Sequence, residues 1–227
     1  MNIEQARFNM IEQQIRPWDV LDTQVLQLLA SVKREDFVPL AHKAMAFVDM
    51  EIPLREGGAR GQSMLSPKVE ARMLQDLAVH KHEKVLEIGT GSGYMAALLA
   101  HRAQRVISLE IVPELAVIAR ENLQQAGIYN VEVRVADGSK EVSANLSVEG
   151  PFDVIVLSGS VEQIPAELLA QLKPGGRLAA VVGDEPMMRA TFVTKGEAGD
   201  GSVITTQPWD TVAPRLSGFA VASKFRF

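Results

Sequence analysis

The chain has 227 residues, of which 47% are hydrophobic and 22% charged, and its net charge at pH 7 is −5. This composition is ordinary for a globular protein, and a negative chain without a cluster of basic residues argues against nucleic acid as a partner. Cysteine is absent, which excludes disulfides, thiolate nucleophiles and cysteine-ligated metals. No signal peptide and no run of ~18 apolar residues is visible, so we expect a cytoplasmic protein with no membrane partner.

The amino-terminal part is expected to consist of helices and one long loop. Apolar residues at near-helical spacing predict an amphipathic helix over residues 3–15, and Asp22 suits the N-cap of a second helix. Residues 51–66 are irregular and rich in glycine, and a loop of that length is uncommon unless it closes over something or is mobile. Ser66, followed by a proline, suits the N-cap of the next helix.

An apolar run that ends in an acidic residue and alternating glycines organises the chain: Val85-Leu86-Glu87-Ile88-Gly89-Thr90-Gly91-Ser92-Gly93-Tyr94. Strand, glycine turn and helix are the expected order, and the glycines let a ligand approach the backbone and the first helical N–H groups. We interpret the turn as the floor of a nucleotide-like pocket. The spacing lacks the third glycine of G-x-G-x-x-G, which argues against a nicotinamide cofactor. On this segment alone, ordinary turn glycines remain an alternative.

Two further acidic residues follow the next predicted strands. Residues 105–110 form a buried strand ending in Glu110, about 20 positions after the first glycine, where a carboxylate binds ribose hydroxyls in nucleotide-binding α/β units. A helix starting at Pro113 leads to a third strand, residues 131–135. Asp137 and Gly138 come directly after it and suit the adenine amino group. The plainer alternatives are a solvated strand-end glutamate and a turn-forming aspartate.

The remaining elements complete an α/β pattern with a mostly parallel sheet, helices on both faces and an antiparallel carboxyl-terminal part. The predictions are a strand at 152–157 with Ser158 at the same edge, a helix at 165–172, a turn at 173–176, a strand at 177–182, strands at 190–195, 202–207 and 218–227, and a hairpin loop at 196–201.

This pattern resembles the Rossmann-like fold of class I S-adenosylmethionine-dependent methyltransferases. The residues that carry the resemblance are Glu87 to Gly93, Glu110, Asp137-Gly138, Phe152-Asp153 and Gln171-Leu172-Lys173-Pro174-Gly175-Gly176-Arg177-Leu178. Within that class, the chain resembles protein-L-isoaspartate (D-aspartate) O-methyltransferases from about residue 25 to about residue 183. The glycine motif, the segment Val32 to Val38, Ile52-Pro53-Leu54, Gly61-Gln62, Pro67 and Gln163-Ile164-Pro165 carry this closer likeness.

The resemblance implies S-adenosyl-L-methionine as cofactor, S-adenosyl-L-homocysteine as product, and repair of proteins that carry isoaspartyl residues, by a monomer that needs no metal. It implies a single domain over 1–227: a covering segment (1–66), a cofactor-binding core (67–183) and carboxyl-terminal strands (184–227). The implied cofactor residues are Glu87, Gly89, Thr90, Gly91, Ser92, Gly93, Glu110, Ile111, Asp137, Gly138 and Ser158.

The chain departs from the family where the methyl acceptor should bind. The family has Thr-Ile-Ser where this chain has Ser63-Met64-Leu65, so that Leu65 takes the place of the serine. We expect Ser63 or Ser66 to orient the acceptor carboxylate, with a plain helix cap as the alternative for Ser66. The departure leaves open a different acceptor, either a small molecule or another protein group, and a non-catalytic S-adenosylmethionine-binding protein.

Overall fold

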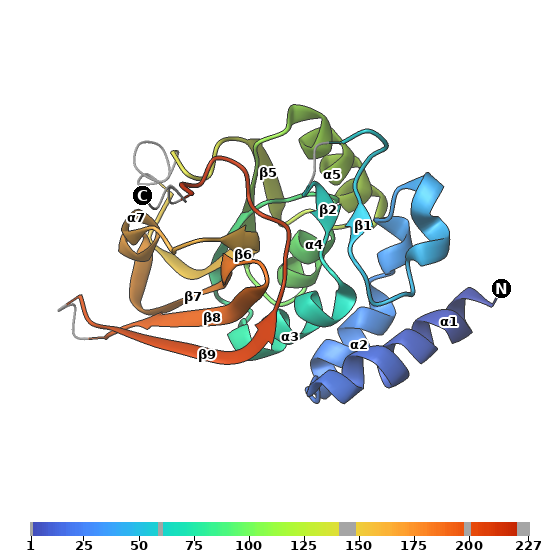
Figure 1. Ribbon diagram of the computed structural model, residues 1–227, viewed down its shortest axis with the longest axis horizontal. Helices are drawn as coiled ribbons and strands as arrows, with labels where there is room; N and C mark the ends of the chain where they lie inside the picture. Colours follow the sequence, from blue (N-terminus) through green and yellow to red (C-terminus); the bar gives the residue numbers. More distant parts are fainter. Residues whose placement is uncertain (1, 59–60, 141–148, 198–200, 222–227) are drawn as a thin grey trace.

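The computed structural model describes residues 2–58, 61–140, 149–197 and 201–221, which build a seven-stranded sheet in the order β5-β4-β3-β6-β7-β8-β9 (Figure 1). Strands β5, β4, β3, β6 and β7 pair in parallel, whereas β8 and β9 continue antiparallel. The predicted fold class is therefore confirmed. The strands are β3 (Lys84–Ile88), β4 (Arg105–Glu110), β5 (Val131–Val135), β6 (Phe152–Val161), β7 (Leu172–Asp184), β8 (Met187–Lys195) and β9 (Val203–Thr211).

Alternate residues of the parallel strands pack into two cores on opposite faces of the sheet, because successive side chains of a strand point to opposite sides. Val85 belongs to the larger core and Leu86 to the smaller one. The larger core is covered by α3 (Pro67–Leu77), α4 (Tyr94–Ala100) and α5 (Pro113–Gln125), while Leu168 of α7 (Ala166–Ala170) packs into the smaller one. Helices therefore cover both faces, as predicted.

The amino-terminal residues form helices beside α3 and a short hairpin (Figure 1). The predicted helix over 3–15 begins as α-helix and continues as a wider π-helix, and Asp22 is the predicted N-cap, accepting from the backbone N–H groups of Gln24 and Val25. The predicted loop 51–66 contains two paired strands. The elements are α1 (Ile3–Met10), η1 (Ile11–Ile15), η2 (Arg16–Trp18), α2 (Thr23–Ser31), η3 (Arg34–Asp36), η4 (Leu40–Met45), β1 (Ile52–Pro53) and β2 (Ser63–Met64).

Three predictions about the later strands were wrong. Residues 173–176 form a bulge inside β7 rather than a turn before it, since Phe152 pairs with Leu172 and Val154 with Arg177. Strand β6 does not end at residue 157 but runs to Val161, with an irregularity between residues 156 and 160. Residues 218–221 form no strand, and the rest of the predicted strand, 222–227, lies outside the described residues.

After β9 the chain returns across the sheet instead of forming another strand of it (Figure 1). We call residues 212–219 the crossing segment. It is fastened at Ser160, whose N–H donates to Pro214 O (2.7 Å), whose Oγ donates to Ala213 O (2.9 Å) and whose carbonyl accepts from Leu216 N (2.9 Å). The crossing segment therefore lies at the carboxyl edge of the parallel strands, where the sequence predicts the ligand.

Among the described residues, no helix combines the length and the apolar character that crossing a lipid bilayer requires.

Candidate functional site

Glu87 lies at the end of β3 and is fully buried. Its carboxylate accepts from the hydroxyls of Ser108 (2.6 Å) and Ser158 (2.7 Å). Burial raises the pKa of Glu87 to about 7, although the two hydroxyl hydrogen bonds oppose this rise. Glu87 thus holds a buried carboxyl group with neutral partners, behind the cavity described below and not among the residues that line it.

Glu110, at the end of the neighbouring strand β4, holds the glycine turn in place. One carboxylate oxygen accepts from Gly91 N (2.8 Å) and the other from Val112 N (3.0 Å). Burial raises the pKa of Glu110, and the backbone hydrogen bonds oppose the rise. Glu110 is 5% exposed and lines a cavity above the turn. It therefore both holds the turn in place and faces the space expected for the ligand.

The three glycines of the turn have positive φ angles of 95°, 55° and 87°, a region that side chains rarely adopt. A Cβ on Gly91 would meet no atom closer than Leu54 at 3.4 Å, and Gly91 lines the cavity. A Cβ on Gly93 would lie 3.3 Å from Ala119 O in α5. Gly93 therefore permits close packing of α4 on α5, while Gly91 leaves room for a ligand.

The structure brings only part of the predicted set together. Ser63, Gly89, Gly91, Glu110, Ile111, Gly138 and Ser158 line one cavity. Thr90 and Ser92 are buried beneath it, where the Thr90 hydroxyl lies 2.6 Å from that of Ser108 and Ser92 O accepts from Asn122. These two residues support the turn from below.

Asp137 is occupied by its own turn. One oxygen accepts from the N–H (3.0 Å) and the hydroxyl (2.6 Å) of Ser139, and the other pairs with Lys140 at 2.9 Å. Burial alone would raise the pKa of Asp137, but the hydrogen bonds from Ser139 and Lys140 outweigh it and lower that pKa. The neighbouring Gly138 lines the cavity and Asp137 does not.

Sequence reasoning missed the residues that close the cavity. Pro214, Arg215, Leu216 and Ser217 of the crossing segment line it. A Cβ on Gly89 would lie 2.7 Å from Cδ2 of Leu216, so this leucine rests on the glycine turn. The cavity is about 70 Å³, well below the ~300–1,000 Å³ of most small-molecule pockets. The crossing segment therefore narrows the space in which a ligand of nucleotide size would bind.

The two candidate serines lie on different cavities. Ser63 lines the cavity above the glycine turn, whereas Ser66 lines a larger one of about 500 Å³ on the other side of the same segment. Ser66 is the N-cap residue of α3, but its side chain makes no capping hydrogen bond. Leu65 between them is 4% exposed, and its carbonyl accepts from the buried Arg34 (2.7 Å).

The comparisons with known proteins identify the family of the chain. The sequence model of the family described as Protein-L-isoaspartate(D-aspartate) O-methyltransferase (PCMT) matches residues 5–211. A protein-L-isoaspartate O-methyltransferase 1 of Syntrophobacter fumaroxidans is 40% identical over 199 residues, which cover 88% of this chain and 89% of the relative. A protein-L-isoaspartate O-methyltransferase of Methanoculleus marisnigri is 42% identical over 191 residues, 84% of this chain and 83% of the relative.

A solved structure shares the fold. The crystal structure of a Plasmodium falciparum protein, described as a protein-L-isoaspartate O-methyltransferase in complex with S-adenosyl-L-homocysteine, superposes with a TM-score of 0.76 over 92% of this chain and 98% of that one. The two sequences are 19% identical, so this likeness concerns the fold.

Proposed function

Because the chain belongs to the protein-L-isoaspartate(D-aspartate) O-methyltransferase family, we propose that it transfers a methyl group from S-adenosyl-L-methionine to the free carboxyl group of L-isoaspartyl residues in damaged proteins. The observation that supports this most is the shared cavity, which joins the glycine turn, the Glu110 carboxylate and the Ser63 hydroxyl. We further propose a single cytoplasmic domain that acts as a monomer, without nucleic acid.

The cavity fits the cofactor chemically. We assign Glu110 to the ribose hydroxyls, because a carboxylate accepts from both at once. Gly138 and Ile111 would face the adenine, and Gly89 and Gly91 would admit the methionine part. Glu87 and its serine partners lie beneath that end and supply negative charge. Thr90, Ser92, Gly93 and Asp137 would act by holding the turns.

The cofactor, when bound, supplies a methyl group on a positively charged sulfur. The acceptor carboxylate is already ionised at neutral pH, so the chain needs no general base. Its residues must orient the carboxylate and exclude water, and alignment alone can lower the barrier by ~7–11 kcal/mol. Leu54, Leu109 and Leu216 line the cavity and provide the apolar walls that exclude water.

We assign the acceptor carboxylate to Ser63 and Arg215, which line the same cavity. The Ser63 hydroxyl has no hydrogen-bond partner among the described residues. Arg215 donates through Nη2 to Gly183 O (2.9 Å) and pairs through the same nitrogen with Asp184 (3.4 Å), whereas its Nη1 is buried and unpartnered within that part of the chain. The unpartnered Nη1 can donate one charge-assisted hydrogen bond to a carboxylate, so we propose that Arg215 compensates for the leucine at position 65.

The test is a methyl-transfer assay with labelled S-adenosylmethionine and matched peptides that contain either isoaspartate or aspartate. We expect base-labile label on the isoaspartyl peptide only. Ser63→Ala and Arg215→Ala should each raise KM for that peptide ~10-fold or more, since a hydrogen bond to a charged group contributes ~1.5–3 kcal/mol. Ser66→Ala should have a smaller effect, because Ser66 lies on the other cavity.

A different acceptor is the second candidate, and the burial of Leu65 favours it, since the family's serine is replaced there by a core residue. Label on proteins of a cell extract but not on the isoaspartyl peptide would support this second candidate. Cofactor binding without any transfer would instead indicate a protein that binds S-adenosylmethionine without catalysis.

A further inference from the structure

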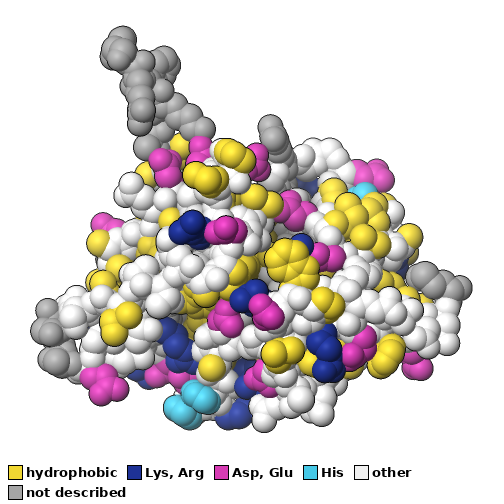
Figure 2. Space-filling view, turned by 60° about the horizontal axis from the view of Figure 1, so that its bottom comes forward, with side chains coloured by type: hydrophobic (Ala, Val, Ile, Leu, Met, Phe, Trp, Pro, Cys, Tyr) yellow, Lys and Arg dark blue, Asp and Glu magenta, His cyan; other side chains and the backbone are white. Residues whose placement is uncertain are grey.

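A groove of about 500 Å³ lies beside the proposed acceptor site, between η2, the start of α3, the β7–β8 turn and the end of β9. Both tryptophans of the chain, Trp18 and Trp209, line it. We call it the tryptophan groove. In the face shown in Figure 2, hydrophobic side chains gather in the middle beside pairs of basic and acidic side chains.

Both indole rings are held by cations of α3. Lys68 Nζ lies 4.0 Å from the centre of the Trp18 ring and pairs with Asp49, and Arg72 lies 5.2 Å from the centre of the Trp209 ring. These cation–π contacts fix the ring positions before a ligand arrives. Tryptophans in such positions are typical of recognition surfaces, because they supply a large contact area at little entropic cost.

The groove is exposed, and its methionines make part of its wall adaptable. Trp18 is 44% exposed, Met50 41% and Met187 82%. Methionine side chains adjust to different apolar partners. The groove can therefore bind apolar or aromatic side chains of different shapes.

The groove lining carries three carboxylates and three cations, but the third cation, Arg72, pairs with Asp19 and Asp76 outside the lining. Lys68 and Arg189 pair with the lining carboxylates Asp49 and Asp210. Glu51 lines the groove but has no ion-pair partner among the residues described, and burial together with nearby Glu185 raises its pKa. A basic side chain of the ligand would complement this carboxylate.

Two segments join the groove to the proposed acceptor site. Ser63 lines the cofactor cavity and Ser66 the groove, while Thr211 and Val212 line the groove and Pro214 and Arg215 the cavity. Three extended residues span ~10 Å. A peptide whose isoaspartyl side chain reaches Ser63 would thus place a side chain two to four residues away in the groove.

We propose that the tryptophan groove binds the substrate peptide next to its isoaspartyl residue, selecting an apolar or aromatic side chain and a neighbouring lysine or arginine. The inference rests on the proposed function, since it takes the isoaspartyl peptide as substrate.

The test compares isoaspartyl peptides with blocked termini that differ only at the positions two to four residues from the isoaspartate. These positions carry either glycine, or phenylalanine and lysine, or phenylalanine and glutamate. We expect KM to be ~10-fold lower for the phenylalanine–lysine peptide than for the glycine peptide, because burying an aromatic side chain contributes ~1.5–3 kcal/mol. Glu51→Gln should remove the preference for lysine over glutamate.

Trp18→Ala should raise KM for the phenylalanine–lysine peptide 5- to 10-fold (~1 kcal/mol or more), because the phenylalanine then buries less apolar surface. Neither kcat nor the KM of the glycine peptide should change. Trp18→Phe should restore most of the loss. Tyr129→Ala, which removes an aromatic residue that is 83% exposed elsewhere, is the matched control and should change nothing.

Tryptophan fluorescence provides a readout that does not depend on catalysis, since both indoles line the groove. Saturable fluorescence change with the phenylalanine–lysine peptide, but no methylation, would support the groove and refute the proposed function. Methylation with equal KM for all three peptides and no fluorescence change would refute the groove alone. An equal rise of KM for every peptide in Trp18→Ala would also refute it, because that indicates a general structural defect.

Discussion

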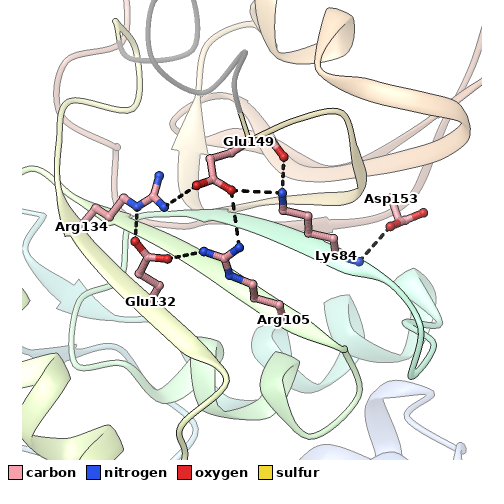
Figure 3. A network of polar contacts seen from close by, with 6 residues as sticks. All are labelled: Lys84, Arg105, Glu132, Arg134, Glu149 and Asp153. Atoms are coloured by element: carbon pink, nitrogen blue, oxygen red, sulfur yellow. Dashed lines mark hydrogen bonds and ion pairs between the residues drawn. The ribbon is translucent and has the colours of Figure 1, made fainter.

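The two edges of the parallel sheet both carry charged residues, but, within the part of the chain that the structure describes, the buried carboxyl groups at the ends of β3 and β4 lack the ion pairs that are found at the other edge. Near the amino edge, Lys84, Arg105, Glu132 and Glu149 form a network of ion pairs, which the side chain of Arg134 joins from further along β5 (Figure 3). At the carboxyl edge, Glu87 and Glu110 have only hydroxyl and backbone N–H partners among the described residues.

The pKa values express this difference. Hydrogen bonds from Arg134 and Arg105 lower the pKa of Glu132 to about 2, whereas burial raises the pKa of Glu87 to about 7. Paired charges hold the sheet together at the first edge. Unpaired buried carboxylates at the second edge destabilise the empty protein and become favourable when a cationic ligand arrives, which fits a sulfonium cofactor.

The largest expected effect is that of Glu110→Ala on the binding of S-adenosylmethionine. The change removes the proposed ribose contacts and two anchors of the glycine turn, and hydrogen bonds to a charged group contribute ~1.5–3 kcal/mol each. We expect Kd to rise ~100-fold or more in calorimetry. Glu132→Ala at the amino edge is the control and should leave Kd unchanged; similar losses in both variants would contradict the contrast between the edges.

Glu87→Gln tests whether the buried carboxylate destabilises the protein at high pH. Folding raises the pKa of Glu87 from 4.5 to about 7, so its contribution to stability is full below pH 4.5 and is lost as the pH rises through about 7. Glutamine does not titrate. The free energy of unfolding of the variant, relative to that of the wild type, should therefore increase by up to ~3 kcal/mol between pH 5 and pH 8.5.

Denaturant titrations at both pH values, without cofactor, measure this difference. Glu114→Gln, at an exposed position of α5, is the control. A pH dependence that is the same in wild type and Glu87→Gln would show that the carboxylate at the end of β3 does not carry this penalty.

Gly89→Ala and Gly127→Ala compare a glycine of the site with one outside it. Both have positive φ, 95° and 70°, so alanine costs ~1–2 kcal/mol of backbone strain at either position. Only at Gly89 would the new Cβ also collide, with Leu216. We expect both variants to lose thermal stability, Gly89→Ala more, and Gly89→Ala alone to weaken cofactor binding; equal binding in the two would remove Gly89 from the site.

The smallest effect is expected for Glu132→Gln at the amino edge. The Glu132 side chain is 44% exposed, and exposed ion pairs contribute only ~0–1 kcal/mol. Since folding lowers its pKa to about 2, this contribution is present above pH 4.5 and is lost as the pH falls toward 2. Urea titrations should show a small loss at pH 7 and a smaller one at pH 3. A loss above ~2 kcal/mol at pH 7 would contradict the view that these ion pairs are ordinary exposed ones.

The sequence was sufficient for features that depend on local pattern. The spacing from the glycine turn to Glu110 places both at one edge, because the ends of adjacent parallel strands meet there. Asp22 was recognisable as an N-cap for the same local reason. Ser108 could also have been recognised, because it is a polar residue inside an apolar strand. In the structure its hydroxyl links Glu87 to Thr90.

Features that depend on distant contacts were not predictable. The crossing segment meets Ser160 more than 50 residues away in the chain, at a strand end shifted by an irregularity in β6. No periodic pattern marks such a contact, so a strand was expected at 218–227 instead. Likewise, only the fold separates Ser63 from Ser66, since the two lie on opposite sides of one short segment.

The fastening at Ser160 has a kinetic consequence. The crossing segment narrows the cavity in which we place the methyl donor, and it also carries Arg215, which we assign to the acceptor. We therefore expect it to move aside when the donor enters and to close over the donor before the peptide binds. Donor and acceptor should then add in a compulsory order, donor first, and peptide in excess should slow turnover by trapping the closed, donor-free protein. Initial-velocity and product-inhibition patterns would reveal this order of binding. Random addition would mean that the crossing segment opens independently of donor and peptide binding.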